Sequence, residues 1–292
     1  MGPFQYFKPE TLEEALLLLK NYGARAKVLA GGTDLVVMMR ERKLRPEYVV
    51  DLQALGLNYI SLDGEGLKVG ALTTIREIER SPKLKQSYPI LPQAASQLAF
   101  LAIRNMATIG GNLCNAAPSA DMAPPLLALG TKLKLAHLGG ERVVPIEEFF
   151  TGPGKTALEA SELLLELQIP TLPPYSGGVY LKHGVKGAQG LAVVGVAAVI
   201  TLEPDGEKFK DVRLALGAVA PTPVRARRAE ILLQGQKIDS RLIEDAASLA
   251  SDCSSPIDDI RGSAQYRREM VKVKTRQAIG EAIELAKAGA RR

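Results

Sequence analysis

Two pairs of adjacent glycines mark places where the backbone of this 292-residue chain could hold a ligand. They lie in Ala30-Gly31-Gly32-Thr33-Asp34 and in Thr108-Ile109-Gly110-Gly111-Asn112. Glycine lets backbone amides approach a phosphate closely, and a helix that begins there directs its free N–H groups and the positive end of its dipole to the same point. A single turn of this kind, capped by Thr33 or Asp34, is ordinary. Two in one chain favour an extended diphosphate ligand.

Two polar residues outside these turns are further candidates. Asp121 follows the segment Ala117-Pro118-Ser119-Ala120 and could cap the next helix or accept hydrogen bonds from a ligand hydroxyl. Lys182 stands before a long apolar segment and could reach a phosphate in a cleft between domains, where cofactors commonly bind. The ordinary interpretation of its neighbour His183 is a surface histidine.

The common nucleotide-binding motifs are not matched. The first glycine turn begins Gly-Gly-Thr, so it lacks the GxGxxG dinucleotide fingerprint. The stretch Gly152-Pro153-Gly154-Lys155-Thr156 is similar to the end of a P-loop, but that motif requires a glycine where Phe149 stands. The sequence therefore argues against nucleotide hydrolysis.

Cysteine and histidine usage argues against metal chemistry on this chain. Its two cysteines, Cys114 and Cys253, are too few for an iron–sulfur cluster held by thiolates, and they form no zinc pattern. The two histidines, His137 and His183, offer no His-rich metal site. We therefore expect no metal site here, and any redox metal on another chain.

Composition and charge restrict the classes of protein to which this chain can belong. Hydrophobic residues make up 46% and charged residues 24%, which is typical of a globular chain. The net charge is +5, but residues 261–292 alone hold nine Lys or Arg and three Asp or Glu. A solvated helix face is the favoured interpretation and a docking surface the alternative, whereas nucleic acid is disfavoured because no aromatic platform accompanies the charges.

Hydropathy predicts a cytoplasmic protein without a membrane span. The longest apolar segment, residues 191–202, is too short to cross a bilayer. The first residues lack the charged and apolar regions of a secretory signal.

The secondary structure that must position these residues follows from the apolar periodicity and the turn signals. Thr11 and Glu14 form a capping box at the start of the first helix, and Thr73 or Thr74 caps a later one. We predict helices over residues 12–23, 35–41, 75–80, 91–102, 240–251 and 263–288. We predict strands over residues 26–30, 48–52, 163–169, 191–202 and 212–219, and hairpins over 60–70 and 133–146. Residues 170–174 are predicted to form a linker.

The motifs, in this order, resemble the FAD-binding medium subunit of the molybdenum hydroxylases, the family of xanthine dehydrogenase and molybdenum-type carbon monoxide dehydrogenase. The matching segments are residues 29–35, 104–112, 117–121, 149–155, 162–164 and 220–223. The Gly-Pro-Gly-Lys stretch looks most like bacterial xanthine dehydrogenase FAD subunits. The resemblance covers nearly the whole chain.

The resemblance implies an α+β fold with two domains. Residues 1–174 would form a two-part FAD-binding domain of the vanillyl-alcohol-oxidase (PCMH) type, with subdomains at about 1–58 and 59–174. Residues 175–292 would form a small CO-dehydrogenase-flavoprotein C-terminal α+β domain.

The resemblance also implies a set of FAD contacts and no catalytic residue, since the protein's task would be to place the flavin. The positions that match the family's FAD contacts are Val28, Leu29, Ala30, Gly31, Gly32, Thr33, Asp34, Leu35, Leu98, Thr108, Ile109, Gly110, Gly111, Asn112, Asp121, Leu164 and Lys182. Leu191 falls near the outer face of the flavin ring. Gln189 stands where some relatives have an acidic residue near an NAD site.

Partners follow from the same resemblance. The [2Fe–2S] clusters and the molybdenum cofactor would lie on a small iron–sulfur subunit and a large molybdenum-cofactor subunit, in a dimer of heterotrimers. FAD on this chain would pass electrons to NAD, a quinone or oxygen.

The alternatives are a free-standing FAD-dependent oxidoreductase with its own small substrate and a flavin-free scaffold. Purines, aromatic rings and carbon monoxide remain open as substrates of the whole enzyme.

Overall fold

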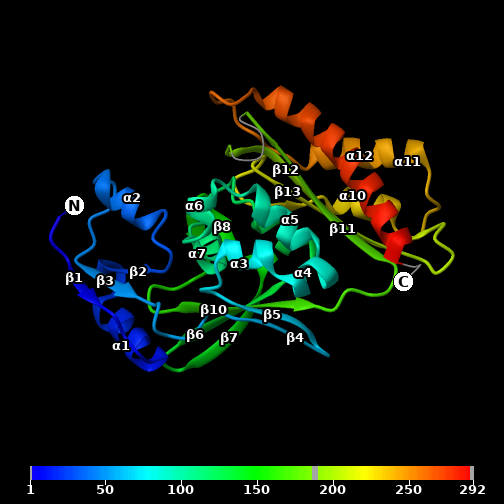
Figure 1. Cartoon of the computed structure of the whole chain (residues 1–292). Helices are drawn as coiled ribbons and strands as arrows, with labels where there is room; N and C mark the ends of the chain where they lie inside the picture. The colour runs from blue at the N-terminus through cyan, green and yellow to red at the C-terminus, as the bar shows by residue number, and fades with distance from the viewer. Residues whose placement is uncertain (1, 186–189, 290–292) are drawn as a thin grey trace.

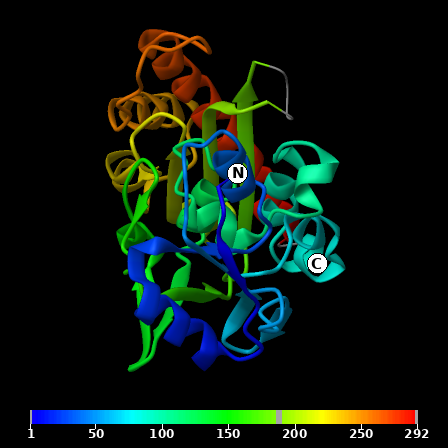
Figure 2. The same cartoon turned by 90° about the vertical axis from the view of Figure 1, so that its left-hand side faces the viewer.

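Three larger β-sheets and one two-stranded ribbon organise the described residues of the chain (Figures 1 and 2). The computed structural model describes residues 2–185 and 190–289. The first sheet uses the N-terminal stretch, the second the middle of the chain and the third the stretch after the residues predicted as a linker. Helices fill the space between the second and third sheets.

The N-terminal sheet is parallel, with strand order β1-β3-β2. Its first helix, α1, begins as predicted, because the Thr11 hydroxyl accepts from the Glu14 amide and the Glu14 carboxylate accepts from the Thr11 amide. The first glycine turn follows β2 at the carboxyl end of this sheet, where open α/β sheets commonly bind ligands. The elements are β1 (Gln5–Phe7), α1 (Leu12–Tyr22), a 3-10 turn (Gly23–Arg25), β2 (Ala26–Leu29), α2 (Leu35–Arg40) and β3 (Tyr48–Asp51).

The middle sheet is antiparallel, with strand order β4-β5-β10-β6-β7. Both predicted hairpins are confirmed within it. Its strands are β4 (Ile60–Asp63), β5 (Gly66–Gly70), β6 (Lys132–His137), β7 (Gly140–Pro145) and β10 (Leu163–Pro170), and the ribbon consists of β8 (Phe150–Gly152) and β9 (Lys155–Thr156). One face packs against helices in a common apolar core, and α1 packs against the other.

The helices of this middle part are short. They are α3 (Ile75–Arg80), α4 (Pro82–Ser87), α5 (Ile90–Gln97), α6 (Leu101–Arg104), α7 (Ile109–Cys114), α8 (Ala123–Ala128) and α9 (Ile146–Phe149). Figure 1 shows most of them above the middle sheet.

The third sheet is antiparallel, with strand order β11-β12-β13-β14, and both of its faces are covered. Every residue of β12 is buried, because alternate side chains such as Val199 face the helices of the middle part and the others, such as Val196, face α12. This explains the unbroken apolar run in the sequence. The elements are β11 (Ser176–Gly184), β12 (Ala192–Leu202), β13 (Phe209–Gly217), β14 (Val224–Arg225), α10 (Arg227–Leu233), α11 (Ser240–Asp252) and α12 (Ala264–Gly289).

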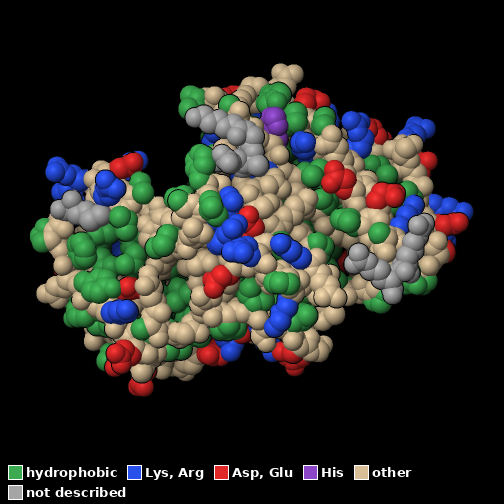
Figure 3. All heavy atoms as spheres, viewed as in Figure 1, with side chains coloured by type: hydrophobic (Ala, Val, Ile, Leu, Met, Phe, Trp, Pro, Cys, Tyr) green, Lys and Arg blue, Asp and Glu red, His purple; other side chains and the backbone are tan. Residues whose placement is uncertain are grey.

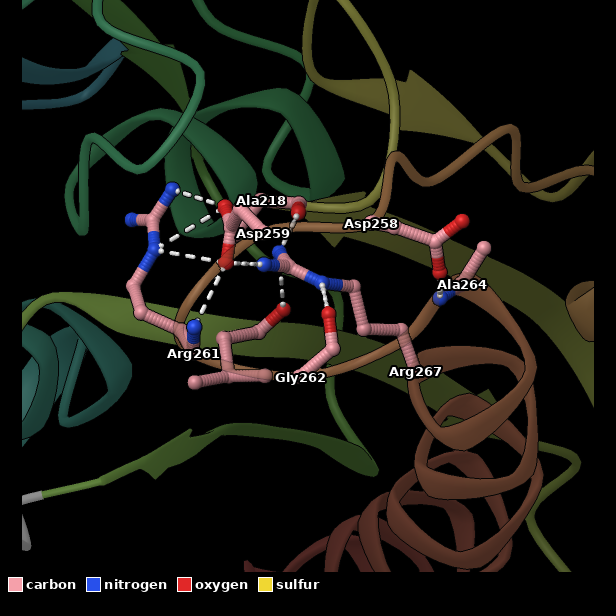
Figure 4. Close-up of polar contacts among 8 residues, drawn as sticks. Ala218, Asp258, Asp259, Arg261, Gly262, Ala264 and Arg267 are labelled. Atoms are coloured by element: carbon pink, nitrogen blue, oxygen red, sulfur yellow. Dashed lines mark hydrogen bonds and ion pairs between the residues drawn. The ribbon is translucent and has the colours of Figure 1, made fainter.

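A buried arginine anchors the start of α12 (Figure 4). The Arg267 guanidinium donates to Asp259 Oδ1 at 2.6 Å, to Val193 O at 3.3 Å and to Ala218 O at 3.2 Å. Asp259 also accepts from Arg261. These contacts tie the segment before α12 to the start of β12 and to the turn after β13.

The predicted helix over residues 91–102 is wrong in one respect. The chain forms α5, leaves the helical path at Leu98–Phe100 and then forms the single turn of α6. Ala99 has a φ of 43°, a left-handed conformation that interrupts a helix. The carbonyls of Leu98 and Ala99 accept from the Arg104 guanidinium instead of from later backbone amides.

Candidate dinucleotide-binding site

The two glycine turns meet in the structure, although they are separated in the sequence by a strand, a hairpin and several helices. Gly31 packs directly on the backbone before the second turn, so that a Cβ at Gly31 would overlap the Met106 carbonyl and lie 3.0 Å from Ala107 Cα. Only glycine permits this approach. Figure 3 shows the surface hollowed beside the lobe that carries α2, at the side where these turns lie.

The first turn presents backbone donors that the fold does not use. The amides of Gly31, Gly32, Thr33 and Asp34 donate to no acceptor in the described part of the chain. Gly32 has a φ of 72°, in the left-handed region that glycine adopts readily. Asp34 occupies the N-cap position of α2, but its side chain makes no capping bond. Because α2 has only six residues, the loop amides themselves, more than a helix dipole, are the means of binding an anion.

The glycine amides of the second turn are not free to bind a ligand. The expectation that both of them would be unhindered is therefore wrong. The Gly110 amide donates to Ala71 O at 2.8 Å, and the Gly111 amide donates to the Thr108 hydroxyl at 3.0 Å. The Ile109 amide is also used, by Thr73 O. These residues form the first turn of α7. The Ile109 and Gly110 amides hold that helix against the loop that follows β5.

One polar atom of the second turn is left without a partner. Asn112 Oδ1 is buried and makes no hydrogen bond among the described residues. A buried amide oxygen without a partner is unfavourable, and such groups mark places where a ligand or water supplies the missing bond. Unused loop amides, a glycine contact and an unsatisfied amide oxygen thus lie in the two turns, and they fit the polar parts of a dinucleotide.

The apolar candidates occupy three places. Val28 and Leu29 belong to β2, which leads into the first turn, and Leu35 begins α2. Leu98 at the end of α5 and Leu164 on β10 are buried in the same apolar core as Ile109. The structure therefore places Leu98, Leu164 and Ile109 in one apolar core.

Asp121 and Lys182 form a buried ion pair across the chain. Lys182 Nζ lies 2.8 Å from Asp121 Oδ2 and donates to Gln97 O at 2.8 Å, and the two side chains are 1% and 7% exposed. The Tyr180 hydroxyl donates to Asp121 Oδ1 at 2.9 Å. Asp121 does not cap α8, whose N-cap position is Met122.

Burial governs the proton affinity of this cluster. It raises the pKa of Asp121 above its ordinary value, although the Lys182 ammonium and the Tyr180 hydroxyl oppose the rise. Burial and the neighbouring carboxylate raise the pKa of Tyr180 well above its ordinary range. Tyr180 therefore stays protonated and serves as a donor to Asp121.

Three residues of this region were not predicted from the sequence. Gln93 accepts from the Tyr180 amide, Gln97 donates to Tyr180 O, and Arg104 holds the turn between α5 and α6. The glutamines lie four residues apart on α5, so an amide pair on one helix face was the available signal.

Other sequence expectations have the following outcomes. Leu191 is 64% exposed just before β12, and Gln189 lies outside the described residues. Within residues 2–185 and 190–289, no group of three or more metal-ligating side chains is found. No helix in that part of the chain is both long and apolar enough to cross a membrane.

The fold and the paired turns define an α+β protein with a candidate site for an extended, dinucleotide-like ligand. Comparison with protein families identifies the class. The family described as "FAD binding domain in molybdopterin dehydrogenase" matches residues 2–172, and "CO dehydrogenase flavoprotein C-terminal domain" matches residues 180–282.

Similar proteins agree with this assignment over nearly the full length of both chains. The xanthine dehydrogenase FAD-binding subunit of Escherichia coli O157:H7 is 35% identical over 96% of each chain. The glyceraldehyde dehydrogenase medium chain of Sulfolobus acidocaldarius is 37% identical over 95% of this chain and 98% of its own. The carbon monoxide dehydrogenase structure from Hydrogenophaga pseudoflava superposes with a TM-score of 0.93 at 32% identity, over 96% of this chain and 97% of its own.

The chain belongs to the FAD-binding medium subunits of the molybdenum hydroxylases. The predicted fold class, a two-part FAD-binding domain followed by a CO-dehydrogenase-flavoprotein domain, is confirmed. The predicted boundary at residue 174 and the individual FAD contacts stay predictions.

Proposed function

We propose that this chain is the electron-transfer subunit of a multi-subunit molybdenum hydroxylase, an oxidoreductase. It would receive electrons from [2Fe–2S] clusters on a partner chain and pass them through FAD to NAD, a quinone or oxygen. The observation that carries the proposal is the contact of Gly31 with Met106, which joins a turn with unused amides to the turn that holds the unsatisfied Asn112.

The residues of the two turns suit different parts of FAD. The amides of Gly31, Gly32, Thr33 and Asp34 would donate to the diphosphate, because an array of unused backbone N–H groups favours an anion. Asn112 would pair with a donor of the ligand.

The remaining predicted contacts act by shape and burial. Leu98 and Leu164 share an apolar core with Ile109 of the second turn and would exclude water from the cofactor. The ion pair of Asp121 with Lys182 keeps the third sheet fixed against α5. When bound, FAD supplies the redox chemistry, since it can accept electrons singly and release them in pairs, and the protein supplies binding, orientation and electrostatics.

The cysteines support an arrangement in which the iron lies elsewhere. Cys114 and Cys253 are both free, and they lie in different parts of the structure. Burial raises the pKa of the Cys114 thiol to about 12, which disfavours the thiolate that metals bind. The clusters would therefore lie on another chain. The proposed assembly has a small iron–sulfur subunit and a large molybdenum-cofactor subunit, in a cytoplasmic dimer of heterotrimers.

Spectroscopy of the chain, alone and with its partners, tests this function. The isolated chain, supplied with FAD, should show flavin absorbance. Chemical analysis should find neither iron nor sulfide on this chain. Native purification should recover a cysteine-rich small chain and a large chain, and reduction of their clusters should reduce the flavin. A chain that binds no FAD contradicts the proposal. Flavin that turns over a small substrate without any partner would identify the free-standing oxidoreductase instead.

A further inference from the structure

The turn between α5 and α6 depends on one arginine that the FAD contacts do not include. Arg104 is only 12% exposed, and its guanidinium donates to Leu98 O at 3.1 Å and to Ala99 O at 2.8 Å. The same group donates to Glu79 on α3 at 2.9 Å through Nε. One planar side chain therefore joins two backbone carbonyls to a carboxylate on another helix, a geometry that the fork of donors on arginine permits.

The turn that Arg104 holds contains a strained residue. Ala99 has a φ of 43°, a left-handed conformation that is unfavourable for an L-residue. Neither carbonyl accepts from a backbone amide in the described part of the chain, so the guanidinium is what satisfies them. Burial by itself raises the pKa of Glu79, but Arg76 and Arg104 hold it below its ordinary value, and the carboxylate thus remains charged.

One end of this turn sets the backbone of the candidate flavin site. At the other end, Leu98 belongs to the large apolar core of which Ile109 is also a member. At the α6 end, the amides of Met106 and Ala107 donate to Ile103 O at 3.0 and 2.7 Å, so the turn of α6 sets the backbone on which Gly31 packs. A shift of α6 would therefore separate the two glycine turns.

We propose that Arg104 is a positioning residue of the flavin site, which holds the α5–α6 turn so that the Met106–Ala107 backbone meets Gly31. The proposal rests on the FAD site proposed above. Arg104 touches no part of the ligand in this role. Its effect on FAD is exerted through Leu98, Ala99 and the end of α6.

The test compares Arg104→Met with Arg76→Met in the full-length chain. Arg76 makes the matched control, because it also donates to Glu79 at 2.9 Å but holds no carbonyl of the turn. FAD affinity, measured by quenching of flavin fluorescence, should fall by about tenfold or more in Arg104→Met, as expected for a lost charge-assisted hydrogen bond. In Arg76→Met it should change by less than about threefold, as for a partly exposed ion pair.

Two further variants separate positioning from general stability. Arg104→Lys keeps the charge beside Glu79 but lacks the forked donors of the guanidinium, so its FAD affinity should also fall. If Arg104→Met does not fold, Arg104→Lys tests the positioning role in its place. Ala99→Gly removes the cost of the left-handed φ, so adding it to Arg104→Met should recover part of the affinity. At saturating FAD, the visible circular dichroism of the flavin should differ from wild type in Arg104→Met and move back towards it in the double variant.

The outcomes distinguish this proposal from the function on which it rests. If the wild-type chain binds no FAD, both fail. If wild type binds FAD and the Arg104 variants bind it equally well with the same flavin spectrum, only the role of Arg104 is overturned. It is also overturned if Arg76→Met weakens FAD as much as Arg104→Met, or if Ala99→Gly recovers nothing.

Discussion

Lys182 and Asp121 form an ion pair at 2.8 Å between the third sheet and the segment before α8, and both side chains are buried. Lys182 also donates to Gln97 O, and Asp121 accepts from Tyr180. Both charges are thus paired and hydrogen-bonded, which is the condition for burying them. The pair links the two domains that the family comparison assigns.

Removal of one member of this pair should destabilise the chain strongly. Lys182→Met leaves the Asp121 carboxylate buried without its counter-charge, so unfolding free energy should fall by about 3–5 kcal/mol. Urea denaturation followed by circular dichroism measures the change. Replacing both residues, as in Lys182→Met with Asp121→Leu, should recover most of the loss because no charge is then left unpaired.

Lys68 supplies the control for that experiment. Its ammonium pairs with Asp63 at 2.9 Å on the surface, and Lys68→Met should change stability by less than about 1 kcal/mol. A similar small loss for Lys182→Met would show that water reaches the Asp121–Lys182 pair in solution.

Asn112 should matter for FAD more than for stability. Its Oδ1 has no partner among the described residues, so Asn112→Ala removes no hydrogen bond of that oxygen within the fold. FAD affinity should fall about tenfold, the value of one hydrogen bond of ordinary strength to a ligand. Isothermal titration with FAD measures it, and Asn21→Ala on the exposed face of α1 should leave affinity unchanged. Equal affinities of the two variants would remove Asn112 from the site.

One glycine of each turn should be intolerant of alanine. Gly31→Ala places a Cβ against the Met106 carbonyl, and Gly110→Ala places one 2.7 Å from Ala71 O. Both should lower the melting temperature, because the neighbour in each case is backbone and cannot rotate away.

Gly32 offers a milder change for separating FAD binding from folding. Its Cβ would meet only side-chain atoms, Leu29 Cδ1 at 3.1 Å and Val36 Cγ2 at 3.2 Å, although its φ of 72° makes alanine cost roughly 1–2 kcal/mol. We expect Gly32→Ala to fold and to bind FAD more weakly, as measured by melting and titration.

A melting temperature for Gly31→Ala equal to wild type would show that the turns do not pack as described.

The sequence predicts features that depend on nearby residues and misses those that depend on distant ones. The capping box of Thr11 with Glu14 and both hairpins were predictable, because their determinants lie within a few residues of each other. The break at Ala99 was not, since Arg104, which binds the Ala99 carbonyl, is itself held by Glu79 on α3, far away in the sequence. The Gly110 amide appeared free in the sequence because its acceptor, Ala71 O, lies far away in the sequence, in the loop after β5.

At acidic pH, Asp259 should contribute to the dependence of the unfolding free energy on pH (Figure 4). Hydrogen bonds from Arg261 and Arg267 hold the pKa of this carboxyl well below its usual value of 3.8. A carboxyl whose pKa is lower in the folded than in the unfolded state stabilises the fold at pH values above its unfolded pKa. This stabilisation is lost as the pH falls from the unfolded pKa toward the folded pKa. The stability difference between wild type and Asp259→Asn should therefore be full at about pH 5 and smaller at about pH 3.

Urea unfolding at the two pH values measures this difference directly. Asp252→Asn serves as the control, because Asp252 is exposed at the end of α11, and its effect should stay within about 0.5 kcal/mol at both. A difference for Asp259→Asn that does not shrink on acidification would mean that the carboxylate is not held by the arginines in solution. Since Arg267 also binds Val193 O and Ala218 O, loss of the Asp259 charge should in addition loosen the start of α12, which hydrogen exchange of its first amides would report.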